Sequence, residues 1–148
     1  MRFSEDTGRM LENSVAIELK RRGFALYYLK DRNGREVDFV LQKSDSVAGL
    51  VQACAHPDDP MVRQREEEPL DNALKHFKLK EGVIVTLDYA QTKTIDGKKI
   101  SYVPAYKWFC GDPVRLSVLC KSLEPDPEQQ AQKQDRPCCD DVARRILL

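Results

Sequence analysis

The chain has 148 residues, enough for one domain with a hydrophobic core. Its 24 Lys and Arg residues balance its 24 Asp and Glu residues, so net charge favours neither nucleic acid nor a membrane surface as a partner. No apolar run approaches the roughly 20 residues that cross a bilayer, and MRFSEDTGRMLENS lacks the apolar segment of a signal peptide. We expect a cytoplasmic protein with no membrane partner, and its five cysteines, without a CxxC pair, are expected to be free thiols.

The N-terminal third of the chain predicts one helix and three strands. Apolar residues at helical spacing run up to Gly23, a residue typical of helix ends. Asn33-Gly34 predicts a turn between the first two strands, and the stretch KSDS separates the second from the third. The expected elements are a helix over about 5–22 and strands over 24–30, 36–42 and 47–53.

The middle of the chain predicts a second helix, a buried strand and a hairpin. The stretch MVRQREEEPLDNALKHFKL is helical in pattern, with Pro69 expected to kink the helix or start a new one and Gly82 expected to end it. The continuous apolar run at 83–88 predicts a strand covered on both faces, and Asp96-Gly97 predicts the hairpin turn. This order of elements predicts an α/β fold, a three-layer α/β/α sandwich with a mixed central sheet.

The C-terminal segment differs in composition from the rest. Residues 112–123 predict a short helix, and residues 124–136 are rich in Pro, Gln and acids, which predicts mobility. We therefore expect one domain over residues 1–110, followed by a terminal helix and mobile tail over 111–148.

Two acidic residues alternate with apolar residues in the stretch EVDFV. Period-two alternation predicts that Glu36 and Asp38 share one face of the strand, with Val37 and Phe39 on the other. Either this acidic face is hydrated, or it lines a metal site. The first two strands, paired around Asn33, would also place Lys30 opposite Glu36 on the same face.

The neighbouring strand and the first helix add three candidates to this face. A hairpin centred on Asp45 would place Gln52 directly opposite Asp38, with Cys54 on the same side. Glu12 lies within or beside the apolar stripe of the first helix, so it either faces the sheet and needs a partner or is an edge residue paired with Arg9 or Lys20.

These residues carry a resemblance to a known family. The stretches GRMLENSVAIELKRRG, YYLKDRNGREVDFVLQ, LVQAC and YVPAYKWF, together and in this order, resemble the nuclease-like domain of unknown function at the C-terminus of archaeal and bacterial AAA-type ATPases, within the PD-(D/E)XK nuclease superfamily. The similarity covers roughly residues 7–110. It implies a restriction-endonuclease-like fold, a prokaryotic source, and DNA or an AAA-type ATPase domain, in the same or another chain, as partner.

The resemblance also implies a metal site with two departures from an active nuclease. Glu12, Asp38 and Gln52 fall at the metal-binding positions, where oxygen ligands suit Mg²⁺ or Mn²⁺. The third-strand motif, however, reads Gln52-Ala53-Cys54, so Cys54 stands where an active nuclease has a catalytic lysine. We therefore expect weak metal binding and little catalytic activity.

Three functional interpretations remain open at this point. The first is a degenerate nuclease-fold accessory module associated with an AAA-type ATPase. The second is an active Mg²⁺-dependent endonuclease in which Lys30 replaces the missing lysine, although Lys30 would equally form a plain ion pair with Glu36. The third is a protein-interaction domain with solvated acids. The basic clusters at 20–22, 75–80 and 98–99 are either solvated helix ends and turns or phosphate contacts, and Trp108 is expected to be a core or interface anchor.

Overall fold

The computed structural model describes residues 3–30, 34–43 and 46–110 of the chain. Within these ranges the elements follow the predicted order of helix, three strands, helix, strand and hairpin. The expected helix at 112–123 and the expected mobile tail lie outside the described residues. The elements are α1 (Phe3–Arg21), β1 (Ala25–Lys30), β2 (Glu36–Lys43), β3 (Ser46–Ala53), α2 (Pro60–His76), β4 (Glu81–Thr86), β5 (Gln91–Ile95), β6 (Lys98–Pro104) and α3 (Ala105–Cys110).

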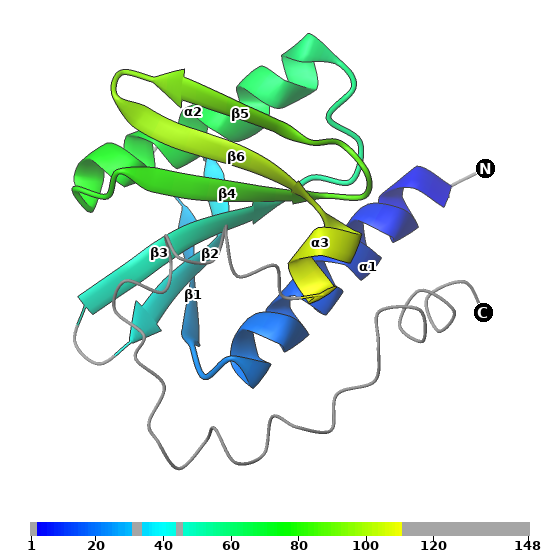
Figure 1. The fold of residues 1–148 in the computed structure, drawn as a ribbon, viewed down its shortest axis with the longest axis horizontal. Helices are drawn as coiled ribbons and strands as arrows, with labels where there is room; N and C mark the ends of the chain where they lie inside the picture. The colour runs from blue at the N-terminus through cyan, green and yellow to red at the C-terminus, as the bar shows by residue number, and fades with distance from the viewer. Residues whose placement is uncertain (1–2, 31–33, 44–45, 111–148) are drawn as a thin grey trace.

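The six strands form one mixed sheet in the order β1-β2-β3-β4-β6-β5 (Figure 1). β1, β2 and β3 pair antiparallel as consecutive hairpins, whereas β4 pairs parallel with both β3 and β6. β5 pairs antiparallel with β6 across a turn in which Asp96 and Gly97 both have positive φ, at 47° and 73°, as the predicted Asp-Gly hairpin requires. The α/β fold with a mixed sheet is confirmed.

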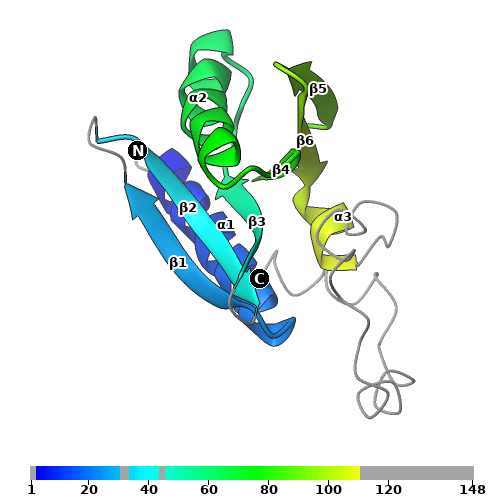
Figure 2. The same cartoon turned by 90° about the vertical axis from the view of Figure 1, so that its left-hand side faces the viewer.

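The helices cover opposite faces of this sheet (Figure 2). Leu11, Val15 and Leu19 of α1 and Trp108 of α3 pack in one apolar cluster, with strand residues such as Val51, Val85 and Val103. The second cluster joins α2 to the other face of the sheet. β4, whose last five residues are all buried, lies between the two layers, as the continuous apolar run predicted. The members of the second cluster include Leu70, Ala73 and Leu74 of α2 with Val40, Leu50, Ile84, Ile100 and Tyr102 of the sheet.

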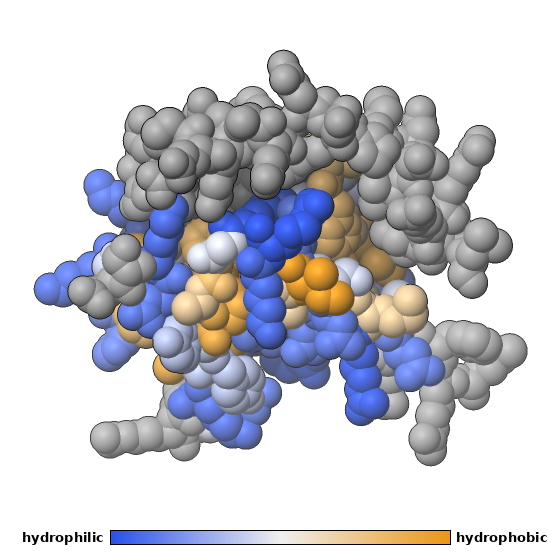
Figure 3. Space-filling view, turned by 90° about the horizontal axis from the view of Figure 1, so that it is seen from below, coloured by the Kyte–Doolittle hydropathy of each residue, from blue (hydrophilic) through white to orange (hydrophobic). Residues whose placement is uncertain are grey.

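The surface carries scattered large apolar side chains. Met10 and Ile17 of α1 and Tyr106 of α3 are exposed, as are Tyr27 and Tyr28 of the edge strand β1. Figure 3, the view from below, shows apolar side chains interrupted and bordered by hydrophilic ones. Of the described helices, none combines the length and the apolar character needed to cross a membrane.

The structure corrects where α2 ends and excludes one of the two alternatives for Pro69. Pro69 does not start a new helix, because a single helix runs from Pro60 to His76 with Pro69 inside it. Gly82 does not end the helix either: Phe77 is the C-terminal cap, and Gly82 lies within β4. A Cβ atom at Gly82 would lie 3.2 Å from side-chain atoms of Leu70 and Leu74, so the glycine admits α2 closely onto the sheet.

We predict that Gly82→Val lowers the free energy of unfolding by about 1–3 kcal/mol, because added methyl groups must displace leucines that are fully buried. The control is Gly8→Ala in α1, where a Cβ meets no atom within 4 Å. This change should stabilise by roughly 0.5–1 kcal/mol, since alanine loses less backbone entropy than glycine in a helix. Urea denaturation measures both, and a Gly82→Val protein as stable as the parent would contradict the close packing.

Candidate functional site

The candidate site lies where the pairing of β3 with β2 ends and its pairing with β4, along its other edge, begins. β3 pairs with β2 as far as Val51, which faces Phe39, and from Val51 to Ala53 it pairs with β4. The predicted register, which places Asp38 next to Gln52, is confirmed for the central residues of this hairpin, because Phe39, Val40 and Leu41 face Val51, Leu50 and Gly49. The two strands thus begin to separate at Asp38 and Gln52.

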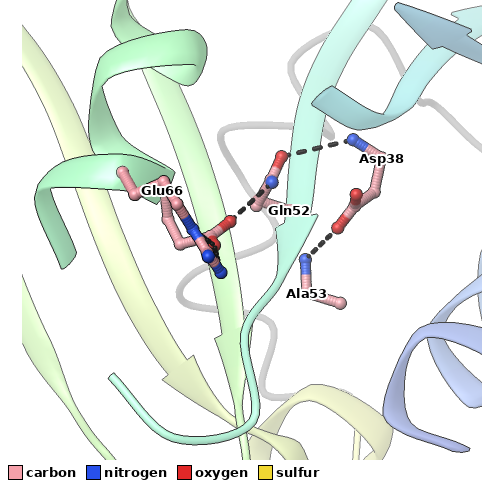
Figure 4. A network of polar contacts seen from close by, with 5 residues as sticks. Asp38, Gln52, Ala53 and Glu66 are labelled. Carbon is pink, nitrogen blue, oxygen red and sulfur yellow. Dashed lines mark hydrogen bonds and ion pairs between the residues drawn. The ribbon is translucent and has the colours of Figure 1, made fainter. Parts of the chain in front are cut away.

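Side chains supply the hydrogen bonds between the two strands at this point (Figure 4). The backbone N–H of Asp38 donates to Oε1 of Gln52 at 3.2 Å, and the backbone N–H of Ala53 donates to Oδ2 of Asp38 at 2.8 Å. Each strand therefore provides one side chain that accepts from the other strand's backbone. Asp38 and Gln52, two of the predicted site residues, are brought together by this reciprocal pair of bonds.

Glu66 of α2 is a third member of the network that the sequence interpretation missed. Its Oε2 accepts from Nε2 of Gln52 at 2.7 Å, and its Oε1 lies 3.2 Å from the guanidinium of Arg65. Its side chain is only 12 % exposed. The run Glu66-Glu67-Glu68 was the available signal, but helical spacing alone does not tell which of three consecutive glutamates faces the strands.

The expected period-two alternation in β2 is wrong for Val37 and Phe39. Val37 packs in the cluster on the α2 side and Phe39 in the cluster on the α1 side, so they do not share a face. The reason is a β-bulge: the register of β2 against β1 shifts between the pairs Tyr27–Val40 and Leu29–Val37. An extra residue in one strand interrupts the alternation of side chains.

Glu12 is exposed on α1 and is not buried in the apolar stripe, which corrects the buried alternative. Its charge nevertheless acts on Asp38. Burial, together with the negative charges of Glu12, Glu66 and Glu36, raises the pKa of Asp38 to about 7, and the hydrogen bond from Ala53 offsets part of this rise. Asp38 therefore lies among three other carboxylates that come from α1, α2 and β2.

Cys54 follows the same strand and is buried on the α2 side, in the second apolar cluster. Burial and the nearby charge of Glu66 raise the pKa of its thiol to about 11. The thiol is thus neutral near pH 7.

Lys30 has the predicted neighbour. It faces Glu36 in the register of β1 and β2, and its Nζ lies 2.7 Å from Oε1 of Glu36. The same carboxylate receives a hydrogen bond from Tyr28 and holds the pKa of Lys30 above its usual value. Both partners are well exposed to water, so the pair contributes little to stability.

Basic residues in the clusters at 20–22, 75–80 and 98–99 make contacts within the protein. Arg22 pairs with Glu18 at 2.8 Å and donates to the carbonyl of Trp108 at 2.7 Å, which holds the buried Trp108 of α3 against α1. Lys75 lies within 3 Å of carboxylate oxygens of both Asp71 and Asp96. Trp108 is confirmed as a core residue, and these contacts favour structural roles for Arg22 and Lys75.

Comparison of the sequence with known proteins shows the family to which the chain belongs. The family model described as a domain of unknown function, DUF4143, matches residues 7–108, more than half of the chain. The chain belongs to the DUF4143 family. It is also 34 % identical, over 116 residues, to the uncharacterized protein MJ1544 of Methanocaldococcus jannaschii. The match covers 72 % of this chain but 25 % of that protein, so the DUF4143 domain here spans about a quarter of the length of its archaeal relative.

We predict that Asp38→Asn stabilises the protein at pH 8 and that the gain shrinks toward pH 4. A carboxyl whose folded pKa is raised to about 7 favours folding below its unfolded pKa of about 3.9, and this contribution is lost as the pH rises through 7. Asparagine keeps an acceptor for the N–H of Ala53 without the charge. Urea denaturation across this pH range measures the gain, and an NMR titration that gives Asp38 a pKa of 4 or below would contradict the prediction.

Proposed function

We propose that this DUF4143 domain is a nuclease-fold accessory module of an AAA-type ATPase with little or no catalytic activity of its own. The proposal rests on the PD-(D/E)XK resemblance of the sequence and on one structural observation. Asp38 and Gln52, which stand at metal-binding positions of that pattern, hydrogen bond to the backbone of each other's strands. Side chains used in this way stabilise the sheet at the position where a nuclease would hold its metal ion.

The missing positive charge supports the same proposal. Cleavage of a phosphodiester concentrates negative charge on the phosphate oxygens, and positioned cations or donors usually supply much of the stabilisation. Cys54 is neutral at physiological pH, while the ammonium group of Lys30 is held by Glu36. The alternative, an active endonuclease that uses Lys30, needs Lys30 to exchange Glu36 for a phosphate.

The donor set of the site suits at most a weakly held divalent ion. Within the three described ranges, no three His, Cys, Asp or Glu side chains are grouped closely enough to hold a metal ion. Asp38 and Glu66 offer carboxylate oxygens and Gln52 an amide oxygen, which are hard ligands that suit Mg²⁺ or Mn²⁺. A bound cation would offset the carboxylate repulsion that, together with burial, raises the pKa of Asp38, and it would supply Lewis acidity toward a phosphate.

The partner in this proposal is an ATPase domain in the same or another chain, in a prokaryotic cytoplasm. The match covers 25 % of the length of the M. jannaschii relative. This supports the proposal that the DUF4143 domain works as one part of a longer chain. DNA is the second partner implied by the resemblance. Arg22 and Lys75 make ion pairs within the protein, which leaves them less available to DNA phosphates.

We predict that the protein does not cut supercoiled plasmid or single-stranded DNA in Mg²⁺ or Mn²⁺. Loss of one well-placed transition-state donor typically slows an enzyme by about 10²–10³-fold, and the absence of the motif lysine should cost no less. Gel assays of the parent with Asp38→Ala, Lys30→Ala and Cys54→Lys variants measure this. Cleavage that appears only with Cys54→Lys would support a nuclease site that lacks its lysine.

Two results would favour the alternative, an active endonuclease that uses Lys30. Robust cleavage by the parent that disappears in Asp38→Ala would overturn the inactive module. If Lys30→Ala abolished that cleavage too, Lys30 would be the replacement lysine. Asp38→Ala also controls for a contaminating nuclease, whose activity would survive the substitution.

A further inference from the structure

Three consecutive glutamates of α2 contact three different parts of the sheet. Glu66 contacts Gln52 of β3, Glu67 contacts β5 and β6, and Glu68 lies 2.6 Å from Arg35, just before β2. Successive helical residues point about 100° apart, which explains the three directions. One turn of α2 is therefore fixed by side-chain contacts on several sides.

Glu67 is the most deeply buried of the three glutamates, and it is not part of the candidate site. Its side chain is 8 % exposed, with Oε2 2.7 Å from Nζ of Lys93 on β5 and Oε1 2.8 Å from the hydroxyl of Tyr102 on β6. Tyr102 is fully buried. Burying a carboxylate is costly unless it is paired. These two donors therefore stabilise the Glu67 side chain between α2 and the sheet.

The backbone of this helical turn has one hydrogen bond fewer than usual. Pro69 has no N–H, so the bond from residue 69 to the carbonyl of Arg65 cannot form. The missing bond spans Glu66, Glu67 and Glu68. Side-chain contacts of this turn consequently carry more of its positioning than they would in an uninterrupted helix.

We propose that Lys93 and Tyr102 are positioning residues that, by holding Glu67, fix the turn of α2 that presents Glu66 to Gln52. The inference deepens the proposed function, since it concerns the same Asp38–Gln52–Glu66 network. When the Lys93 side chain is removed, the buried Glu67 carboxylate keeps only the hydrogen bond from Tyr102 among the two described here. The turn then moves outward toward water, and Glu66 withdraws from Gln52 and Asp38.

The test is an NMR titration of the Asp38 carboxyl in Lys93→Ala, with Lys75→Ala as the matched control. Lys75 also joins α2 to the β5–β6 hairpin, through Asp96, but at the C-terminal end of the helix. Withdrawal of Glu66 removes a charge that raises the pKa of Asp38, so this pKa should fall in Lys93→Ala and stay unchanged in Lys75→Ala. Loss of the Lys93 charge with Glu66 still in place would leave this pKa unchanged or raise it, so the direction of the change separates the two causes.

Two further variants and one binding measurement complete the test. Tyr102→Phe removes only a hydroxyl and should lower the pKa of Asp38 in the same direction, whereas Lys93→Arg should restore the parent value. Calorimetric titration with Mn²⁺ should show roughly tenfold weaker binding in Lys93→Ala, as expected when an outer partner of a metal site is removed. Circular dichroism is the control that checks whether each variant is folded.

The outcomes separate the positioning role from the proposed metal site. An unchanged or raised Asp38 pKa in folded Lys93→Ala, or an equal fall in Lys75→Ala, would overturn the positioning role. Failure of the parent to bind Mn²⁺ would overturn the metal site alone, because the Asp38 titration requires no metal.

Discussion

The exchange of hydrogen bonds between Asp38 and the end of β3 is the constraint on which the middle of this sheet depends. Where the pairing of β2 with β3 ends, backbone groups of both strands would lose their ladder bonds while still half-buried, which is costly. Asp38 accepts from Ala53, and Gln52 accepts from Asp38, so both N–H groups are satisfied. The antiparallel part of the sheet (β1–β3) therefore continues into the parallel part (β3–β4) without leaving these two N–H groups unpaired.

This solution places a carboxylate where its charge is disfavoured. Burial and the charges of Glu12, Glu66 and Glu36 all act against ionised Asp38, and the bond from Ala53 only partly offsets them. Perturbed carboxyls of this kind cluster at functional sites, although structural networks produce them as well. In this DUF4143 domain the same side chain serves the sheet and forms the candidate site, so the two roles are not independent.

Local chemistry explains how much of the fold and site could be predicted. The Asp96-Gly97 turn, the Lys30–Glu36 pair and the nearness of Asp38 to Gln52 follow from turn residues and hairpin register, which depend on neighbours in sequence. The β-bulge and the role of Glu66 could not be predicted in this way. The bulge belongs to the pairing of β1 with β2, and the role of Glu66 depends on how α2 packs on the sheet, and no short sequence pattern records either.

The burial of Cys54 gives the molecule an internal reporter. A thiol reacts with alkylating reagents as thiolate, and Cys54 has both a raised pKa, of about 11, and little exposed surface. Its amide is bonded to the carbonyl of Val85, which fastens the end of β3 to β4. Cys54 becomes reactive only when this part of the sheet opens, so the rate at which it is modified measures how often β3 separates from its neighbours in the otherwise folded protein.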